Sequence, residues 1–187
     1  MLRRRSSHFA LSTSHSGGPL HYAKLNRSRR LAVALVAVVA ADWITKFLVQ
    51  NHLSLYSRRA LVEGWVWLAH SRNPGIAFSF FRDLPDLVRL PLLVAAALAG
   101  IFVAAQMALR TQDELIRLAA VLVIAGAVGN LGDRLMNGGV TDFILIRWFP
   151  FVFNVADVAI TVGAVLLAAR MLLADARQGG PATPVQS

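Results

Sequence analysis

The sequence predicts an all-α membrane protein with four transmembrane helices, and with a small extramembrane β and interfacial-helix region between helices 1 and 2. Of the 187 residues, 56% are hydrophobic and only 16% are charged, whereas about 25% are charged in an ordinary soluble domain. The apolar residues also gather in four runs, each close to the roughly 20 residues that a helix needs to cross a bilayer. The runs cover about 31–49, 87–109, 115–136 and 152–173.

Residues 1–30 precede the first run and are strongly basic. They contain seven lysine and arginine residues and no acidic residue, and they lack hydrophobic periodicity, which is typical of a disordered tail. The chain has a formal net charge of +9, but its basic residues lie mostly in tails and short loops. We therefore expect a cytoplasmic tail that sets the orientation in the membrane, and no nucleic-acid partner.

The first run, residues 31–49, has two interpretations. A basic flank, eleven apolar residues and the small pair Ala40-Ala41 resemble a cleaved signal peptide. Apolar character resumes at Phe47, however, so that the run reaches the length of a membrane span. We expect a retained helix, in which Asp42 and Lys46 share one face because they are four residues apart.

The segments between the other runs are short or amphipathic. In residues 50–86, aromatic and apolar residues alternate with polar or small ones, which predicts short strands and an interfacial segment around the turn signal Asn73-Pro74-Gly75. Residues 140–151 are amphipathic and aromatic, and a polar tail, residues 174–187, ends the chain. Eleven lysine and arginine residues fall on the side of both termini and five on the other side, which predicts that both termini are cytoplasmic.

The polar residues within these runs fall at one depth. With a helical rise of about 1.5 Å per residue, the polar groups of the first and third runs lie about 16 to 24 Å from the inner side, and that of the fourth lies about 8 Å below the outer side. All are therefore in the outer half of a core about 30 Å thick. An intramembrane ionisable residue indicates a functional site. The residues are Asp42, Lys46, Asn130, Asp133 and Asp157, with Asp142 just beyond the third run.

Several chemistries do not fit these residues. There is no cysteine, which excludes thiol nucleophiles and thiolate metal sites. Lys46 is the only lysine outside the tail and has no serine nucleophile motif near it. The five histidines lie in the tail or are isolated, so we expect no metal and no cofactor.

Paired acids remain. Two neighbouring carboxyl groups share a proton, so that one can activate water while the other polarises an amide carbonyl. Asp142 and Asp157 are the best pair because both lie at the boundary that water reaches. Asp42 and Asp133 lie beside Lys46 and Arg134, and we interpret them as structural ion pairs. A purely structural ion-pair network remains an alternative for the whole cluster.

Five ordered blocks closely resemble the lipoprotein signal peptidases, or signal peptidase II, of bacteria, over about residues 30 to 173. They are Asp42-x-x-Thr45-Lys46, Asn73-Pro74-Gly75-Ile76-Ala77-Phe78-Ser79, Gly129-Asn130-x-x-Asp133-Arg134, Val140-x-Asp142-Phe143 and Phe153-Asn154-x-Ala156-Asp157. The resemblance implies a four-helix aspartic endopeptidase of the bacterial inner membrane, with its site near the outer face, and we expect a monomer. It would cleave diacylglyceryl-modified prolipoproteins before the lipidated cysteine.

By the same resemblance, Asp142 and Asp157 would be catalytic. Asn73, Asn130, Arg134 and Asn154 would line or order the site, and Asp42, Lys46 and Asp133 would support it. The resemblance also favours a retained first helix, because that helix carries one of the blocks. The alternative from another class is a small membrane protein that conducts protons or ions through its buried acids. Because those acids occupy the outer half only, the peptidase is the better hypothesis.

Overall fold

A computed structural model describes residues 19–75 and 84–178. Its four long helices are α1 (Pro19–His52), α2 (Asp86–Arg110), α3 (Glu114–Asn137) and α4 (Val155–Gln178). The segments Asn26–His52, Asp86–Arg110, Glu114–Asn137 and Val155–Ala174 are long and apolar enough to cross a membrane. The predicted four-helix membrane fold is confirmed.

Helix α1 begins at Pro19, so the prediction that residues 1–30 are disordered is wrong for residues 19–30. Proline is favoured at the first position of a helix because its fixed φ suits the helix and its missing N–H would have no partner there. Arg27 on this extension forms an ion pair with Glu114 at the start of α3, with the Arg27 Nε and Glu114 Oε1 atoms 2.6 Å apart. The remaining tail residues, 1–18, lie outside the described residues.

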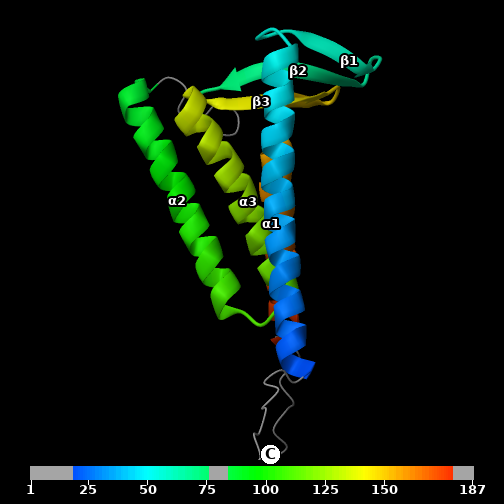
Figure 1. The fold of residues 1–187 in the computed structure, drawn as a ribbon, viewed down its shortest axis with the longest axis vertical. Coiled ribbons are helices and arrows are strands. Elements are labelled where there is room, and N and C mark those ends of the chain that lie inside the picture. Colours follow the sequence, from blue (N-terminus) through cyan, green and yellow to red (C-terminus); the bar gives the residue numbers. More distant parts are fainter. Residues whose placement is uncertain (1–18, 76–83, 179–187) are drawn as a thin grey trace, which may run out of the picture.

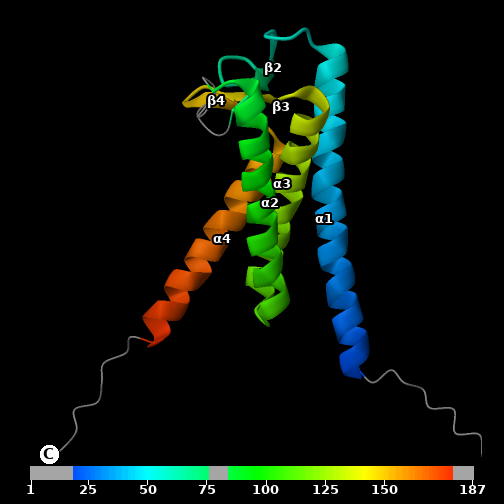
Figure 2. The same cartoon turned by 90° about the vertical axis from the view of Figure 1, so that its left-hand side faces the viewer.

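Helix α3 is the central helix of the bundle and contacts α1, α2 and α4 (Figures 1 and 2). Its contact with α4 depends on small residues. A Cβ on Gly126 would lie 2.3 Å from the Ala156 carbonyl oxygen, and one on Gly163 would lie 2.6 Å from that of Ala119. Small residues let helix backbones approach closely in a membrane, where van der Waals packing drives association. Helices α1 and α4 lie close together near the sheet and diverge toward the other end (Figure 2).

A four-stranded antiparallel sheet lies across one end of the bundle, with the strand order β1-β2-β3-β4 (Figure 1). The first hairpin, β1 (Arg58–Val62) and β2 (Val66–Asn73), confirms the strands predicted between helices 1 and 2. The second hairpin, β3 (Val140–Ile146) and β4 (Phe149–Phe153), is formed by the amphipathic segment between helices 3 and 4. The expected interfacial helix falls partly on residues 76–83, outside the described residues.

Strand pairing between β2 and β3 joins two loops that are far apart in the sequence. Ser71 is opposite Asp142, and Asn73 is opposite Val140. Helix α3 ends at Asn137, and the next residue, Gly138, has a φ of 69°, which is in the left-handed region that favours glycine. The sheet therefore holds Asp142 over the ends of α1 and α3, where the polar residues of those helices also lie.

At the opposite end of the bundle, Asp113 connects α3 to α4. Its Oδ1 atom accepts hydrogen bonds from the N–H groups of Leu115 and Ile116, which caps α3, and its Oδ2 atom lies 2.5 Å from Arg170 Nε. The Arg170 guanidinium holds the pKa of Asp113 below its usual value of 3.8. The ion pair therefore stabilises the fold above that value, and the stabilisation is lost as the pH falls through the lower pKa of the folded protein.

We expect Asp113→Ala to lower the melting temperature more than Asp113→Asn, because asparagine still caps a helix but cannot pair with Arg170. The melting temperature is measured in detergent between pH 3 and pH 7. The difference between the native chain and Asp113→Asn should shrink as the pH falls below about 4, because the unfolded chain binds a proton there while the folded carboxylate binds one only at its lower pKa. A difference that stays constant down to pH 3 contradicts the ion-pair contribution.

Candidate active site

Helix α4 begins with a reciprocal pair of hydrogen bonds between Asn154 and Asp157. The Asp157 N–H donates to Asn154 Oδ1 at 2.9 Å, and the Asn154 N–H donates to Asp157 Oδ2 at 3.3 Å. This is a capping-box arrangement, in which the residue before the helix and the third helical residue satisfy each other's backbone N–H groups. Starting the helix in this way fixes the position of the Asp157 carboxylate.

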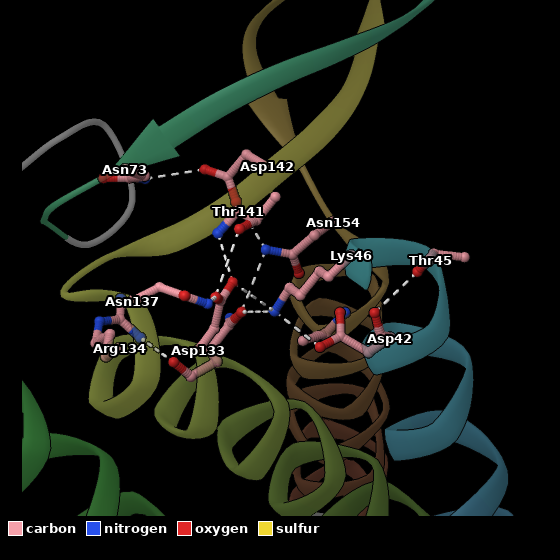
Figure 3. Close-up of polar contacts among 12 residues, drawn as sticks. Asp42, Thr45, Lys46, Asn73, Asp133, Arg134, Asn137, Thr141, Asp142 and Asn154 are labelled. Atoms are coloured by element: carbon pink, nitrogen blue, oxygen red, sulfur yellow. Dashed lines mark hydrogen bonds and ion pairs between the residues drawn. The ribbon is translucent and has the colours of Figure 1, made fainter. Parts of the chain in front are cut away.

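The other end of the Asn154 side chain contacts two more site residues. Its Nδ2 atom donates to Asp142 Oδ1 at 2.7 Å and to Asn130 Oδ1 at 3.2 Å (Figure 3). An amide group has two N–H donors and one carbonyl acceptor. Because the carbonyl oxygen caps α4, both donors remain for β3 and α3. Asn154 is fully buried and connects both candidate catalytic acids.

Asp142 lies on β3 and is 3% exposed. Its Oδ2 atom accepts a hydrogen bond of 3.1 Å from Asn73 Nδ2, at the end of the neighbouring strand β2 (Figure 3). Burial and the nearby Asp157 charge raise the pKa of Asp142 to about 7, whereas the hydrogen bonds from Asn73 and Asn154 lower it. The Asp142 carboxyl group therefore exchanges its proton near neutral pH.

Asp157 is partly exposed. Its Oδ1 atom accepts a hydrogen bond of 2.8 Å from Asn130 Nδ2 on α3. Each acid thus has its own amide donor, Asn73 for Asp142 and Asn130 for Asp157, while Asn154 contacts both. The two carboxyl groups predicted as a pair do come together, and they lie in unequal surroundings.

Lys46 provides the positive charge below this pair. Its Nζ atom donates to Asn130 Oδ1 at 2.9 Å and lies 2.8 Å from Asp42 Oδ2 and 3.7 Å from Asp133 Oδ2. Lys46 is 3% exposed and Asp42 is fully buried. The predicted Asp42–Lys46 ion pair is therefore confirmed as a contact. Removing the acidic partners would leave a buried lysine unpaired, which is strongly destabilising.

Asp42 also holds the start of α4. Its Oδ1 atom accepts a hydrogen bond of 2.9 Å from the N–H of Ala156, one of the N–H groups that the first turn of a helix leaves unpaired. The positive end of the helix dipole favours this carboxylate. A Cβ on Gly129 would lie 2.5 Å from Asp42 Oδ2, so the glycine leaves the space that the carboxylate occupies.

Asp133 does not pair with Arg134, and this prediction is wrong. The Asp133 carboxylate instead accepts hydrogen bonds of 2.6 Å from the Thr141 N–H and from Asn137 Nδ2 (Figure 3). Arg134 donates to the backbone carbonyl oxygens of Gly75 at 2.9 Å and Asn130 at 3.3 Å. Adjacent residues on a helix project about 100° apart, so their side chains do not face each other.

Three polar residues that the sequence analysis did not select support the strand that carries Asp142. Gln50 Nε2 donates to Thr141 Oγ1 at 2.7 Å, and Thr141 and Asn137 both donate to Asp133. Thr141 is fully buried beside Asp142. The helical spacing carried a signal for two of them, since Gln50 lies four residues after Lys46 and Asn137 four residues after Asp133.

Arg134 lines a hollow beside the site. It is 8% exposed and shares a cavity of about 150 Å³ with Pro74, Leu90, Leu93 and Gly138, and with Asp86 and Arg89 at the start of α2. The hollow joins the end of α3, the start of α2 and the turn after β2. In the part of the chain that the structure describes, no group of three or more acidic or histidine residues is arranged to hold a metal ion.

Comparison with known proteins identifies the arrangement. The family model for signal peptidase (SPase) II matches residues 34–173. The chain belongs to the signal peptidase II family. The lipoprotein signal peptidase of Pseudomonas syringae pv. tomato is 40% identical over 142 residues, which cover 73% of this chain and 82% of that protein. The lipoprotein signal peptidase of Geobacter sulfurreducens is 35% identical over 150 residues, which cover 79% and 93%.

A solved bacterial membrane enzyme has the same fold as this signal peptidase II. The TM-score is 0.73 at 21% identity, and the match covers 82% of this chain and 94% of the other. The resemblance predicted from the five sequence blocks is confirmed, and the family makes this chain a multi-pass membrane peptidase. The match begins at residue 34, so the first transmembrane helix belongs to the family domain.

We expect Gly129→Ala to lower the melting temperature of this signal peptidase II and its activity, because the new methyl group displaces the Asp42 carboxylate from Lys46 and from the α4 N-terminus. Gly100→Ala on α2 is the matched control, since its Cβ would have no atom within 4 Å. Both variants carry the same change in helix propensity, which favours alanine. Equal melting temperatures for the two variants contradict the steric argument.

Proposed function

We propose that this signal peptidase II is an aspartic endopeptidase that removes the signal peptide from diacylglyceryl-modified prolipoproteins, cleaving before the lipidated cysteine. The observation that carries the proposal is the pair Asp142 and Asp157, joined by Asn154 in unequal surroundings. Relatives named lipoprotein signal peptidase, at 35% to 40% identity, support the substrate class.

The proposed chemistry divides the work between the two acids. Asp142 is the neutral acid, which its pKa of about 7 supports, and the partly exposed Asp157 is the carboxylate base. Two acids whose surroundings separate their pKa values suit an acid and a base role. The Lys46 ammonium donates to Asn130, and the amide of Asn130 in turn donates to Asp157, which holds that carboxylate in place.

In the first step, Asp157 takes a proton from water while the water oxygen bonds to the scissile carbonyl carbon. Asp142 gives its proton to the carbonyl oxygen, which yields a tetrahedral diol. In the second step, Asp157 passes its proton to the amide nitrogen, the C–N bond breaks, and Asp142 recovers a proton from a diol hydroxyl. The peptide is cleaved, both acids return to their starting states, and no covalent acyl-enzyme forms.

The proposed membrane placement puts the sheet end of the bundle at the outer face of the bacterial inner membrane and both termini in the cytoplasm. The excess of basic residues near the termini supports this orientation. The hollow beside Arg134 has apolar walls from Leu90 and Leu93, which suits a substrate that enters sideways from the lipid. The diacylglyceryl chains then stay in hydrocarbon while the peptide bond reaches the acids.

We expect Asp142→Asn and Asp157→Asn each to reduce cleavage by about 10²- to 10⁴-fold, the usual contribution of a positioned acid or base. Purified variants are incubated with a lipidated and an unlipidated prolipoprotein. Glu63→Gln, at an exposed turn, is the matched control for loss of one carboxylate. Normal cleavage by either aspartate variant would falsify the mechanism. Proton or ion flux through reconstituted vesicles, without cleavage, would instead support a conducting protein.

We expect the cleavage rate to fall as the pH rises through about 7, because Asp142 loses the proton that it must donate. Asn73→Ala removes a hydrogen bond that lowers the pKa of Asp142, so the alkaline limb of the pH–rate profile should move to higher pH. Asn51→Ala, an exposed amide that bonds within its own helix, should leave the limb in place. A limb that Asn73→Ala leaves unmoved, or moves to lower pH, contradicts the acid role of Asp142.

A further inference from the structure

The turns of the two β-hairpins meet at one end of the sheet. The Arg147 N–H donates to the Trp65 carbonyl oxygen at 3.0 Å, and the rings of Trp65 and Trp148 contact edge to face with centroids 5.0 Å apart. Strand pairing places Val66 opposite Ile146 beside these turns. We call this group the hairpin-end cluster; it consists of Leu61, Val62, Trp65, Arg147, Trp148 and Phe149.

The hairpin-end cluster exposes more apolar surface than a water-facing turn normally does. Trp148 is 71% exposed, Leu61 62% and Val62 53%. Contiguous exposed apolar groups indicate a binding surface. The outward side chains of the helices are exposed because they face the hydrocarbon core of the membrane. The cluster belongs to a sheet beyond the helix ends, so contact with that core does not explain its exposed apolar side chains.

The charges around the cluster are mainly positive. The Arg147 guanidinium carbon lies 5.4 Å from the Trp65 ring centroid, and that of Arg58 lies 5.8 Å from the Trp67 ring centroid. Arg58 and Arg59 are both exposed, and Glu63 is the one acidic residue in β1, β2 and the turn between them. Tryptophan is enriched at the membrane–water interface, and arginine binds phosphate oxygens through its planar fork.

The position of the sheet matches the headgroup layer. The apolar segment of α1, Asn26–His52, has 27 residues and is therefore about 40 Å long, which spans the hydrocarbon core of about 30 Å and reaches into a headgroup region. Only five residues separate His52 from the start of β1. The sheet lies across the helix ends, and its hairpin ends project past α1 on the side away from α2 (Figure 1). The cluster is thus placed over the lipid beside the bundle.

We propose that the hairpin-end cluster binds the membrane surface, with its apolar side chains among the lipid headgroups and upper acyl chains, and that Arg58 and Arg147 select anionic phospholipids. The occupant is a lipid monolayer because the surface combines exposed tryptophan and leucine with exposed arginine at headgroup level. Strands β2 and β3, which carry Asn73 and Asp142, are then held at a set height above the lipid. The proposal depends on membrane insertion and not on peptidase chemistry.

The test uses the full chain in lipid nanodiscs with Trp43, Trp65 and Trp67 replaced by phenylalanine, so that Trp148 is the only tryptophan. Its fluorescence is quenched with phosphatidylglycerol or phosphatidylcholine brominated high on the acyl chains. We expect phosphatidylglycerol to quench more strongly, by on the order of two- to five-fold at equal mole fraction. Arg58→Gln/Arg147→Gln should abolish the difference.

The matched control, Arg29→Gln/Arg30→Gln, removes the same charge from exposed positions at the opposite end of α1 and should preserve the lipid preference. If the triple replacement does not fold, a second version keeps every tryptophan. Leu61→Cys becomes the sole cysteine of a cysteine-free chain, and a nitroxide attached there should collide with oxygen more than with a water-soluble nickel complex.

Three results overturn the proposal. Strong quenching of Trp148 by aqueous acrylamide without quenching by brominated lipid places the cluster in water. Equal quenching by the two lipids, or a preference that survives Arg58→Gln/Arg147→Gln, removes the anionic selectivity. Loss of lipid quenching on adding a prolipoprotein, or on raising the number of chains per disc, assigns the surface to a substrate or to a second copy. Because lipid contact is measured without cleavage, failure of the peptidase proposal does not produce any of these results.

Discussion

The contact on which the rest of the structure depends is the buried carboxylate of Asp42. It faces the Lys46 ammonium with one oxygen and the Ala156 N–H at the start of α4 with the other. One carboxylate therefore neutralises a cation inside the bundle and satisfies an unpaired helix N–H. Both would be costly without a partner in a low-dielectric interior. Since Lys46 in turn donates to Asn130, the helices α1, α3 and α4 are held in one relative position at the site.

Asn154 connects the helices held in this way to the two acids. The same residue starts α4 by capping it and uses its remaining donors on Asp142 and Asn130. Helix initiation and the arrangement of the two acids thus share one side chain. The two acids still differ, because Asp142 is buried on a strand while Asp157 is partly exposed on the first turn of a helix. This difference in burial supports the distinct acid and base roles that we propose.

The sheet contributes in a different way from the helices. It brings a loop that follows α1 beside a loop that follows α3, and the β2–β3 register puts Asn73 within hydrogen-bond distance of Asp142. Thr141, Asn137 and Gln50 then tie β3 to the ends of the helices below it. The far end of the same sheet carries the hairpin-end cluster at headgroup level. A single extramembrane unit therefore both carries a proposed catalytic group and presents a surface to the membrane.

The sequence by itself determined the four spans and the family, and it selected most of the polar residues that the structure brings together, because apolar runs of membrane length and intramembrane acids are rare and costly. It also placed the polar residues at one depth, since helical rise is constant. Only the tertiary structure decided which groups pair. Asp133 contacts Thr141 and Asn137 rather than its neighbour Arg134, and Asn154 joins both acids. Residues 140–151 complete a sheet with β2, and residues 19–30 extend α1. These outcomes depend on strand pairing and inter-helix contacts between distant segments, which local patterns of spacing and hydrophobicity do not encode.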